Sequence, residues 1–396
     1  MARPVLHTRV CDILGIEYPV VLAGMGGVAT AELVAAVSEA GGLGIIGAAT
    51  MPPEEIEAQV RKVRSLTDKP FGVDILLPSG VAPAGPQSGN GGQGAPAEMP
   101  QLPKNPIELL PQPYKDFIQK ARQEFGLPDD QETQEEFSRN IRRVGLGPAF
   151  ARQQIEKMLE LKVPVFASGL GNPGPFVEAF HAIGSKVIAL VGNVKNARRV
   201  AEGGVDIIVA QGTEAGGHTG RIGTMALVPQ VVDAVAPIPV LAAGGIGDGR
   251  GVAAALALGA DGVWVGTAFL VTREANWPQV LKDRILAATE EDTRVTRLYS
   301  GKTMRNINNP LIELWEQSGV PALPMGPQGL VSGTLMNAAR RAGKLELLMN
   351  PAGQIAGMLR ETKPARQVLE EMVSQAASVL GEGLPGRVRV SAGTPA

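Results

Sequence analysis

Short apolar runs alternate along the first two thirds of the chain with longer segments in which apolar residues recur at helical spacing. The runs are rich in β-branched residues, as expected of strands buried on both faces of a parallel sheet. The strand-like runs are residues 18–24, 43–47, 71–77, 163–168, 186–191, 205–211, 239–243 and 262–265. The helical segments between them are residues 31–40, 53–65, 150–161, 174–183, 194–202, 225–235 and 249–258.

This alternation predicts an α/β fold, because strands separated by helices pair in parallel through crossover connections. Eight such units within roughly 270 residues have the size of a (β/α)8 TIM barrel. An open doubly wound sheet is the alternative, but no G-x-G-x-x-G with a later acidic residue follows the first strand. We expect a barrel over residues 1–275, a helical cap over 276–385 and a flexible tail over 386–396.

An insertion at residues 78–147 interrupts the barrel pattern after the third strand. Its first half is rich in proline and glycine, which predicts an extended loop, and its second half, about 113–143, is charged and compatible with helix. The carboxyl end of a barrel strand opens on the active-site face. The insertion is therefore either a lid or partner contact, or a surface decoration without catalytic effect. If it is a lid, deleting residues 83–104 should change KM.

Composition and charge narrow the classes of function. The chain has 396 residues and a formal net charge of −2 with acids and bases interspersed, so nucleic acid and anionic membranes are not expected as partners. The single cysteine, Cys11, excludes intrachain disulfides and multi-cysteine metal sites, and no metal is expected. No run of about 18 apolar residues is present. These features predict a cytoplasmic protein, and a homodimer stays open.

Candidate chemistry follows the last three predicted strands. The segment QGTEAGGHTG (211–220) places His218 among glycines that let the backbone approach a flat ligand closely. Gly244 and Gly245 follow strand seven, and Gly266 and Thr267 follow strand eight, where barrels commonly bind phosphate with backbone N–H groups. The sequence therefore indicates a phosphorylated cofactor in the barrel mouth. Turn-forming glycines with no ligand are the alternative.

The segment Gln211 to Gly220, the Gly244–Gly245 pair and the Val265–Gly266–Thr267 end resemble the nitronate monooxygenase superfamily of FMN-dependent TIM barrels, and the motif EAGGH (214–218) is the most specific match. This superfamily includes flavin-dependent enoyl-ACP reductase II and an NADH:quinone reductase. The resemblance implies that His218 is the active-site base or polariser. It also implies FMN contacts from Gly24, Met25, Gln211, Gly216, Gly217, Gly244, Gly245, Trp264, Val265, Gly266 and Thr267.

Asp74 lies in a segment, residues 69–75, that is similar to the superfamily's third strand, whose polar residue touches the flavin. The superfamily usually has asparagine there, whereas an ionised aspartate only accepts hydrogen bonds, so the role of Asp74 stays open. Two other polar residues, Lys302 and Arg305, are expected to be surface charges, with phosphate binding as the alternative.

The resemblance is compatible with two reactions of small-molecule substrates. Oxidation of alkyl nitronates by O2 is favoured by residues 222–232 and 296–302, which are similar to bacterial nitronate monooxygenases. Reduction of enoyl thioesters or quinones, with NADH or NADPH as reductant, is the alternative, favoured by residues 66–73 and 169–173. A non-flavin barrel that acts on a phosphorylated sugar or nucleotide is a further reading, which a colourless purified protein would support.

Overall fold

The computed structural model describes residues 6–78, 81, 106–129 and 147–388. Its central sheet has eight parallel strands in the order β1-β9-β8-β6-β5-β4-β3-β2. A bridge between Val21 and Leu43 joins the two edge strands, so the sheet closes into a barrel and the predicted TIM-barrel fold is confirmed. The strands are β1 (Val20–Leu22), β2 (Gly44–Gly47), β3 (Phe71–Leu76), β4 (Val165–Leu170), β5 (Lys186–Val191), β6 (Ile207–Gln211), β8 (Val240–Ala243) and β9 (Gly262–Val265).

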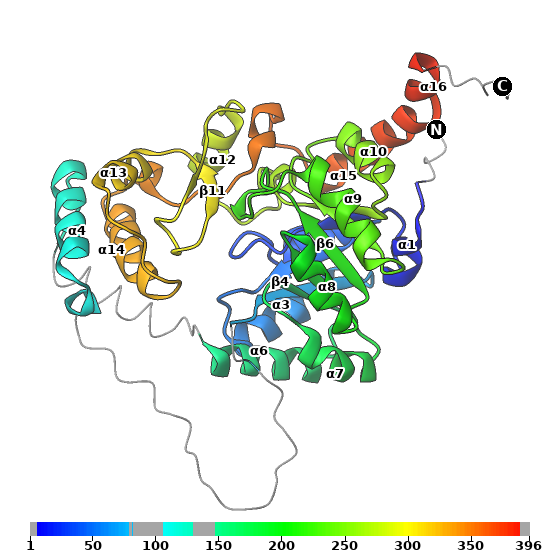
Figure 1. Cartoon of the computed structure of the whole chain (residues 1–396), viewed down its shortest axis with the longest axis horizontal. Helices are drawn as coiled ribbons and strands as arrows, with labels where there is room; N and C mark the ends of the chain where they lie inside the picture. The colour runs from blue at the N-terminus through cyan, green and yellow to red at the C-terminus, as the bar shows by residue number, and fades with distance from the viewer. Residues whose placement is uncertain (1–5, 79–80, 82–105, 130–146, 389–396) are drawn as a thin grey trace, which may run out of the picture.

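Helices surround this barrel, as Figure 1 shows. Two of them begin at side-chain caps: Asn193 accepts a hydrogen bond from the Asn196 amide, and Asp248 accepts one from the Arg250 amide. The surrounding helices are α2 (Ala31–Glu39), α3 (Pro53–Leu66), α6 (Pro148–Glu160), α7 (Val177–Ala182), α8 (Val194–Glu202), α9 (Thr224–Val235) and α10 (Gly249–Ala257). The expected helix 174–183 is divided, because residues Gly174–Phe176 form a 3₁₀ turn before α7.

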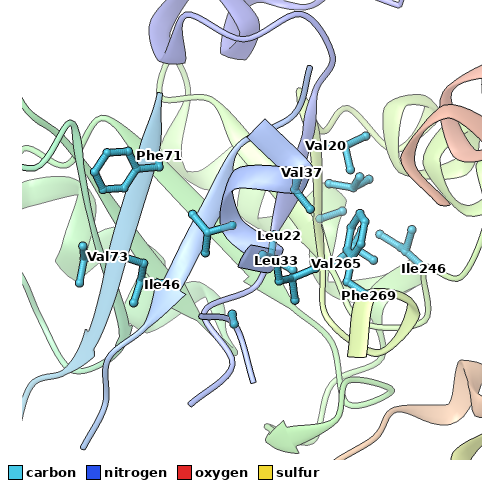
Figure 2. Close-up of a cluster of buried hydrophobic side chains, with 14 of the residues drawn as sticks. Val20, Leu22, Leu33, Val37, Ile46, Phe71, Val73, Ile246, Val265 and Phe269 are labelled. Atoms are coloured by element: carbon cyan, nitrogen blue, oxygen red, sulfur yellow. The ribbon is translucent and has the colours of Figure 1, made fainter. Parts of the chain in front are cut away.

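Side chains alternate between the two faces of the barrel wall. The outward side chains of β1, β2 and β3 belong to one hydrophobic cluster with those of α2; Figure 2 shows Leu22 beside Leu33 and Val73 beside Ile46. Inward side chains form a separate cluster that includes Val21, Ile45, Val209, Leu241 and Trp264. This alternation determines which residues near the strand ends face the interior.

The two ends of the described chain complete the barrel. Helix α1 (Arg9–Leu14) packs Val10, Cys11 and Leu14 against the inward cluster. After β9, helix α11 (Thr267–Leu270) has only four residues, and α15 (Ala365–Ser378) packs on α10 and α2 instead. The side chain of Leu369 in α15 is fully buried in the barrel's outer core. A π-helical turn, Val379–Gly383, then leads to α16 (Leu384–Arg387). Residues 389–396 of the expected tail lie outside the described residues.

The cap has a hydrophobic cluster of its own, on the left of Figure 1. It contains a helix from the insertion, α4 (Gln112–Phe125), whose Phe117 ring meets the Trp315 ring edge-on at 5.0 Å. The other cap elements are η1 (Pro106–Leu109), α12 (Gln279–Leu286), β10 (Thr293–Thr296), β11 (Met304–Ile307), α13 (Pro310–Ser318), α14 (Pro327–Arg341), η3 (Leu345–Leu347) and η4 (Gln354–Met358). The expected loop over 83–104 lies outside the described residues. Among the helices that the structure describes, none is long and apolar enough to cross a membrane.

Candidate active site

Three inward-facing side chains mark the carboxyl end of the barrel. Asp74 on β3, Gln211 on β6 and Trp264 on β9 lie within two residues of the carboxyl ends of their strands. On β3, Phe71, Val73 and Ile75 belong to the outer core, so Asp74 between them faces inward. Because the strands are parallel, these side chains and the loops that follow share one end of the barrel, where TIM-barrel active sites lie.

His218 is held by contacts from both the barrel and the cap. Gly217–His218 forms a short strand, β7, that pairs antiparallel with β11. On the barrel side, Nε2 of Gln211 donates a hydrogen bond of 2.7 Å to the His218 carbonyl. On the cap side, the Thr303 hydroxyl donates one of 2.7 Å to the Thr219 carbonyl. The position of the histidine therefore depends on residues more than eighty positions away.

The imidazole of His218 is half-buried at the barrel mouth. Its Nε2 lies 2.8 Å from the hydroxyl of Ser300, while Nδ1 has no hydrogen bond within the described part of the chain and is not sealed from solvent. Burial lowers the pKa of His218, and the nearby positive charge of Lys302 lowers that pKa further. The ring can thus accept a proton or hold an anion at neutral pH. Sequence reasoning singled out residues 296–302 without recognising Ser300.

A cavity of about 1180 Å³ opens in front of His218. Much of its wall is apolar, with Leu76, Phe150, Leu190 and Met325 among the lining side chains, and His218 and Gln211 contribute polar groups. Three cations also line it, Arg199, Arg221 and Lys302, and the lining residues include no carboxylate. This charge distribution favours an anionic substrate.

The glycines after β8 form a cradle of free backbone donors. Gly244 and Gly245 have φ of +90° and +76°, and the amides of Gly244, Gly245 and Ile246 donate no hydrogen bond to any described residue. Successive amides in this conformation form an anion-binding nest. A Cβ on Gly244 would lie 2.9 Å from the Gly212 carbonyl oxygen, so only glycine fits there.

The other glycine and strand-end positions lie around this cradle. Gly216 packs so closely on the Ala352–Gly353 backbone that a Cβ would come within 2.7 Å of it. The Thr267 hydroxyl accepts a hydrogen bond of 2.9 Å from the Gly353 amide. The side chain of Val265 belongs to the outer core, so this residue presents only its backbone to the mouth. A Cβ on Gly266 would lie 3.6 Å from the Met25 sulfur, which places Met25 beside this strand end.

Asp74 carries a buried carboxyl group beside Gly24. Its Oδ1 accepts a hydrogen bond of 2.6 Å from the Gly169 amide, and a side chain on Gly24 would overlap the carboxyl. Burial raises the pKa of Asp74 well above its ordinary value, which the single hydrogen bond from Gly169 only partly offsets.

The structure separates the two basic residues near the cap. Lys302 is exposed and lines the cavity, whereas Arg305 is buried. Our expectation that Arg305 is a surface charge was therefore wrong. Its guanidinium donates to the Thr213 carbonyl at 3.1 Å and to the Thr293 hydroxyl at 2.9 Å, which ties the loop after β6 to the cap. Burial lowers the pKa of Arg305, and the charge of Glu214 opposes this shift.

The closed parallel barrel brings His218, the free amides after β8 and the large cavity together at its carboxyl end, where enzymes with a TIM-barrel fold bind their substrates. The family model described as "Nitronate monooxygenase" matches residues 7–86 and 108–375. The chain therefore belongs to the nitronate monooxygenase family and is an oxidoreductase.

Individual relatives and solved structures agree with this assignment. The chain is 38% identical to "Putative monooxygenase Rv1533" of Mycobacterium tuberculosis, over 95% of this chain and 98% of that protein. It is 33% identical to "Probable nitronate monooxygenase" of Staphylococcus aureus, over 94% and 98%. The FabK structure from Thermotoga maritima superposes with a TM-score of 0.73 at 32% identity, over 97% of this chain and 100% of that one. The nitroalkane oxidase structure from Streptomyces ansochromogenes does so with a TM-score of 0.74 at 28% identity, over 94% and 98%.

Proposed function

We propose that this protein uses FMN to oxidise alkyl nitronates with molecular oxygen. One observation carries the proposal: a half-buried His218 with a lowered pKa faces a cavity that is lined by cations and no carboxylate. A nitronate is a small anion with an apolar alkyl group, so its charge suits the cations and its body suits the apolar wall. Family membership and the likeness to a nitroalkane oxidase support the same reaction.

The residues at the barrel mouth fit FMN. Its phosphate would be held by the free amides of Gly244 and Gly245, with Gly266 and Thr267 at the neighbouring strand end. Its ring would lie near the backbone of Gly216 and Gly217 and against a further set of residues, Gly24, Met25, Asp74, Gln211 and Trp264. When bound, FMN supplies the redox chemistry by accepting electrons from the substrate and passing them to oxygen.

The chain's own groups orient the substrate and handle its proton. Ser300 fixes Nε2 of His218, which leaves Nδ1 to meet the substrate. A nitronate would receive a hydrogen bond from His218 and an attractive charge from Lys302. A neutral nitroalkane would instead lose its α-proton to the imidazole, whose lowered pKa keeps it unprotonated at neutral pH.

Reduction of an enoyl thioester or a quinone by NADH or NADPH is the second candidate. The size of the cavity favours it, because about 1180 Å³ is more than a short alkyl nitronate fills. The same cations would then face an anionic portion of a larger substrate. In that reaction His218 would polarise a carbonyl group or donate a proton.

Anaerobic mixing of the FMN-loaded protein with propyl-2-nitronate, NADH and NADPH in separate cuvettes distinguishes these reactions. We expect the oxidised flavin band to disappear with the nitronate and to persist with either nicotinamide. Rapid loss of the band with NADH or NADPH would contradict the nitronate oxidase proposal and favour the reduction of an enoyl thioester or a quinone. A protein that stays colourless after incubation with FMN would contradict both.

Replacement of His218 tests the site itself. His218→Ala should retain FMN and lose turnover by a factor of about a hundred or more, as is usual for a general acid or base. Near-native turnover in the flavin-loaded variant would refute the role of His218. For the cellular setting, we infer a reducing compartment such as the cytoplasm, because the only cysteine, Cys11, is buried and unpaired.

A further inference from the structure

The position of Asp74 is unusual for a carboxyl group. It faces the barrel interior at the mouth, whereas its strand neighbours Phe71 and Val73, labelled in Figure 2, face the outer helices. The residue is 7% exposed. A carboxyl group in such a place is either paired with a cation or held neutral, because an isolated buried charge is strongly destabilising.

The two carboxyl oxygens have different surroundings. Oδ1 accepts the hydrogen bond of 2.6 Å from the Gly169 amide. Oδ2 has no hydrogen-bond partner in the described structure, yet it is not among the sealed side-chain atoms. It therefore keeps access to the barrel mouth.

Two glycines make room for this carboxyl group. A Cβ on Gly24, in the turn after β1, would overlap Asp74, and a Cβ on Gly169, in β4, would lie 2.9 Å from Oδ2. Gly169 also lines the large cavity. The carboxyl is thus held between the backbone of the turn after β1 and that of strand β4, with Oδ2 as its free polar atom.

Nothing adjacent offsets a negative charge on Asp74. The neighbouring strands β2 and β4 carry no charged or titratable side chain, and neither does the turn 23–27. On the outer side of β3, hydrophobic residues separate it from α2 and α6. Across the mouth, the titratable and charged groups are His218, whose pKa is lowered, and the cations of the cavity wall, Arg199, Arg221 and Lys302. These three cations are exposed to solvent, and they are not among the groups that shift the pKa of Asp74. No salt bridge among the described residues includes Asp74, and burial raises its pKa.

We propose that Asp74 is a neutral carboxylic acid that donates a hydrogen bond from Oδ2 to an acceptor atom of the flavin ring. The inference rests on the proposed binding of FMN. The isoalloxazine edge offers several nitrogen and oxygen acceptors, and a protonated carboxyl is a donor, whereas a carboxylate only accepts. Asp74 would be a positioning residue. Its ionisation at high pH would remove the donor and place a negative charge beside the ring.

Three variants separate donation, ionisation and shape. Asp74→Asn keeps a donor of similar size that cannot ionise, Asp74→Leu keeps the approximate shape without a donor, and Asp233→Asn makes the same chemical change at an exposed position on α9. The dissociation constant of FMN and the flavin reduction potential are measured from pH 5 to pH 10. Protonation of His218 would also change the charge near the flavin, so the series is repeated in a His218→Gln background, which removes the imidazole.

The wild type and Asp233→Asn should bind FMN tightly at neutral pH, then lose affinity and shift to a lower potential as the carboxyl ionises. Asp74→Asn should bind FMN comparably at neutral pH without this pH-dependent step. Asp74→Leu should bind roughly 2- to 12-fold more weakly, the effect of one hydrogen bond. An identical pH dependence in the wild type and Asp74→Asn, or wild-type affinity in Asp74→Leu, would overturn the inference.

Infrared difference spectroscopy of the wild type against Asp74→Asn gives a readout that needs no turnover. At pH 7 we expect the carbonyl band of a protonated carboxylic acid in the wild type only, with and without FMN. Absence of that band refutes the neutral acid. A wild-type protein that shows the band and yet binds no FMN would instead refute the proposed function, so the two failures are distinguishable.

Discussion

Replacing Ser300 with alanine removes the hydroxyl that lies 2.8 Å from Nε2 of His218. A hydrogen bond between neutral groups contributes about 0.5–1.5 kcal/mol, and one to a charged group about 1.5–3 kcal/mol. His218 stays neutral while it holds a preformed nitronate, but becomes an imidazolium when it takes a proton from a neutral nitroalkane. At about 1.4 kcal/mol per tenfold in rate, kcat/KM should fall about 2- to 12-fold on the nitronate and about 12- to 150-fold on the nitroalkane.

Oxygen consumption with freshly prepared propyl-2-nitronate and with 2-nitropropane measures these two losses, at equal flavin content. Ser318→Ala is the matched control, because the Ser318 hydroxyl donates to the Trp315 carbonyl within the cap. Equal losses on the two substrates would refute the argument that the bond strengthens as His218 gains its proton. Unchanged kinetics on both substrates would show that Ser300 has no role in the reaction.

Three further predictions concern the cofactor cradle, the electrostatics and the fold. Gly244→Val should yield a folded protein without FMN, because φ is +90° and a side chain would crowd the neighbouring backbone; normal flavin absorbance contradicts this. The lowered pKa of His218 keeps the imidazole unprotonated at lower pH, so the acid limb of the kcat/KM profile on the nitroalkane should lie below about pH 6.5. Lys302→Gln removes a positive charge near the imidazole and should move this limb to higher pH. A shift to lower pH would contradict the predicted effect of Lys302. Leu369→Ala should lower the free energy of unfolding by about 2–5 kcal/mol in urea titrations, with Leu384→Ala, at an exposed position, as the control. Equal unfolding midpoints for the two variants would contradict the packing of α15 in the barrel's outer core.

The barrel could be predicted because its signals are local. Each strand, such as residues 205–211, is a short β-branched run between helical segments. Every expected run overlaps a strand of the observed sheet, although β4 extends two residues beyond the expected run 163–168. The nearness of Gly244 to Gly266 follows from the same pattern, because parallel neighbouring strands end at one rim.

The features that sequence reasoning missed are contacts between distant segments. The bond from Ser300 to His218 spans 82 positions, and its only sequence signal was a general likeness of residues 296–302. Buried Arg305 donates one hydrogen bond to the loop after β6 and one to Thr293 in β10, and nothing in the sequence near Arg305 indicates the contact with that loop. Helix α15 lies on the barrel because α11 is too short to cover β9, which becomes apparent only when the ring of helices is assembled.

Because β7 pairs with β11, the geometry around His218 should be less thermally stable than the barrel fold. The barrel and the cap have separate hydrophobic clusters, and regions with separate cores can open independently. If the cap opens first, the Thr303 and Ser300 contacts to the histidine strand are lost while the barrel remains folded. Activity should then be lost on heating before the circular dichroism of the barrel changes, and it should return on cooling. Opening of the cap would therefore be a reversible thermal inactivation that leaves the barrel folded.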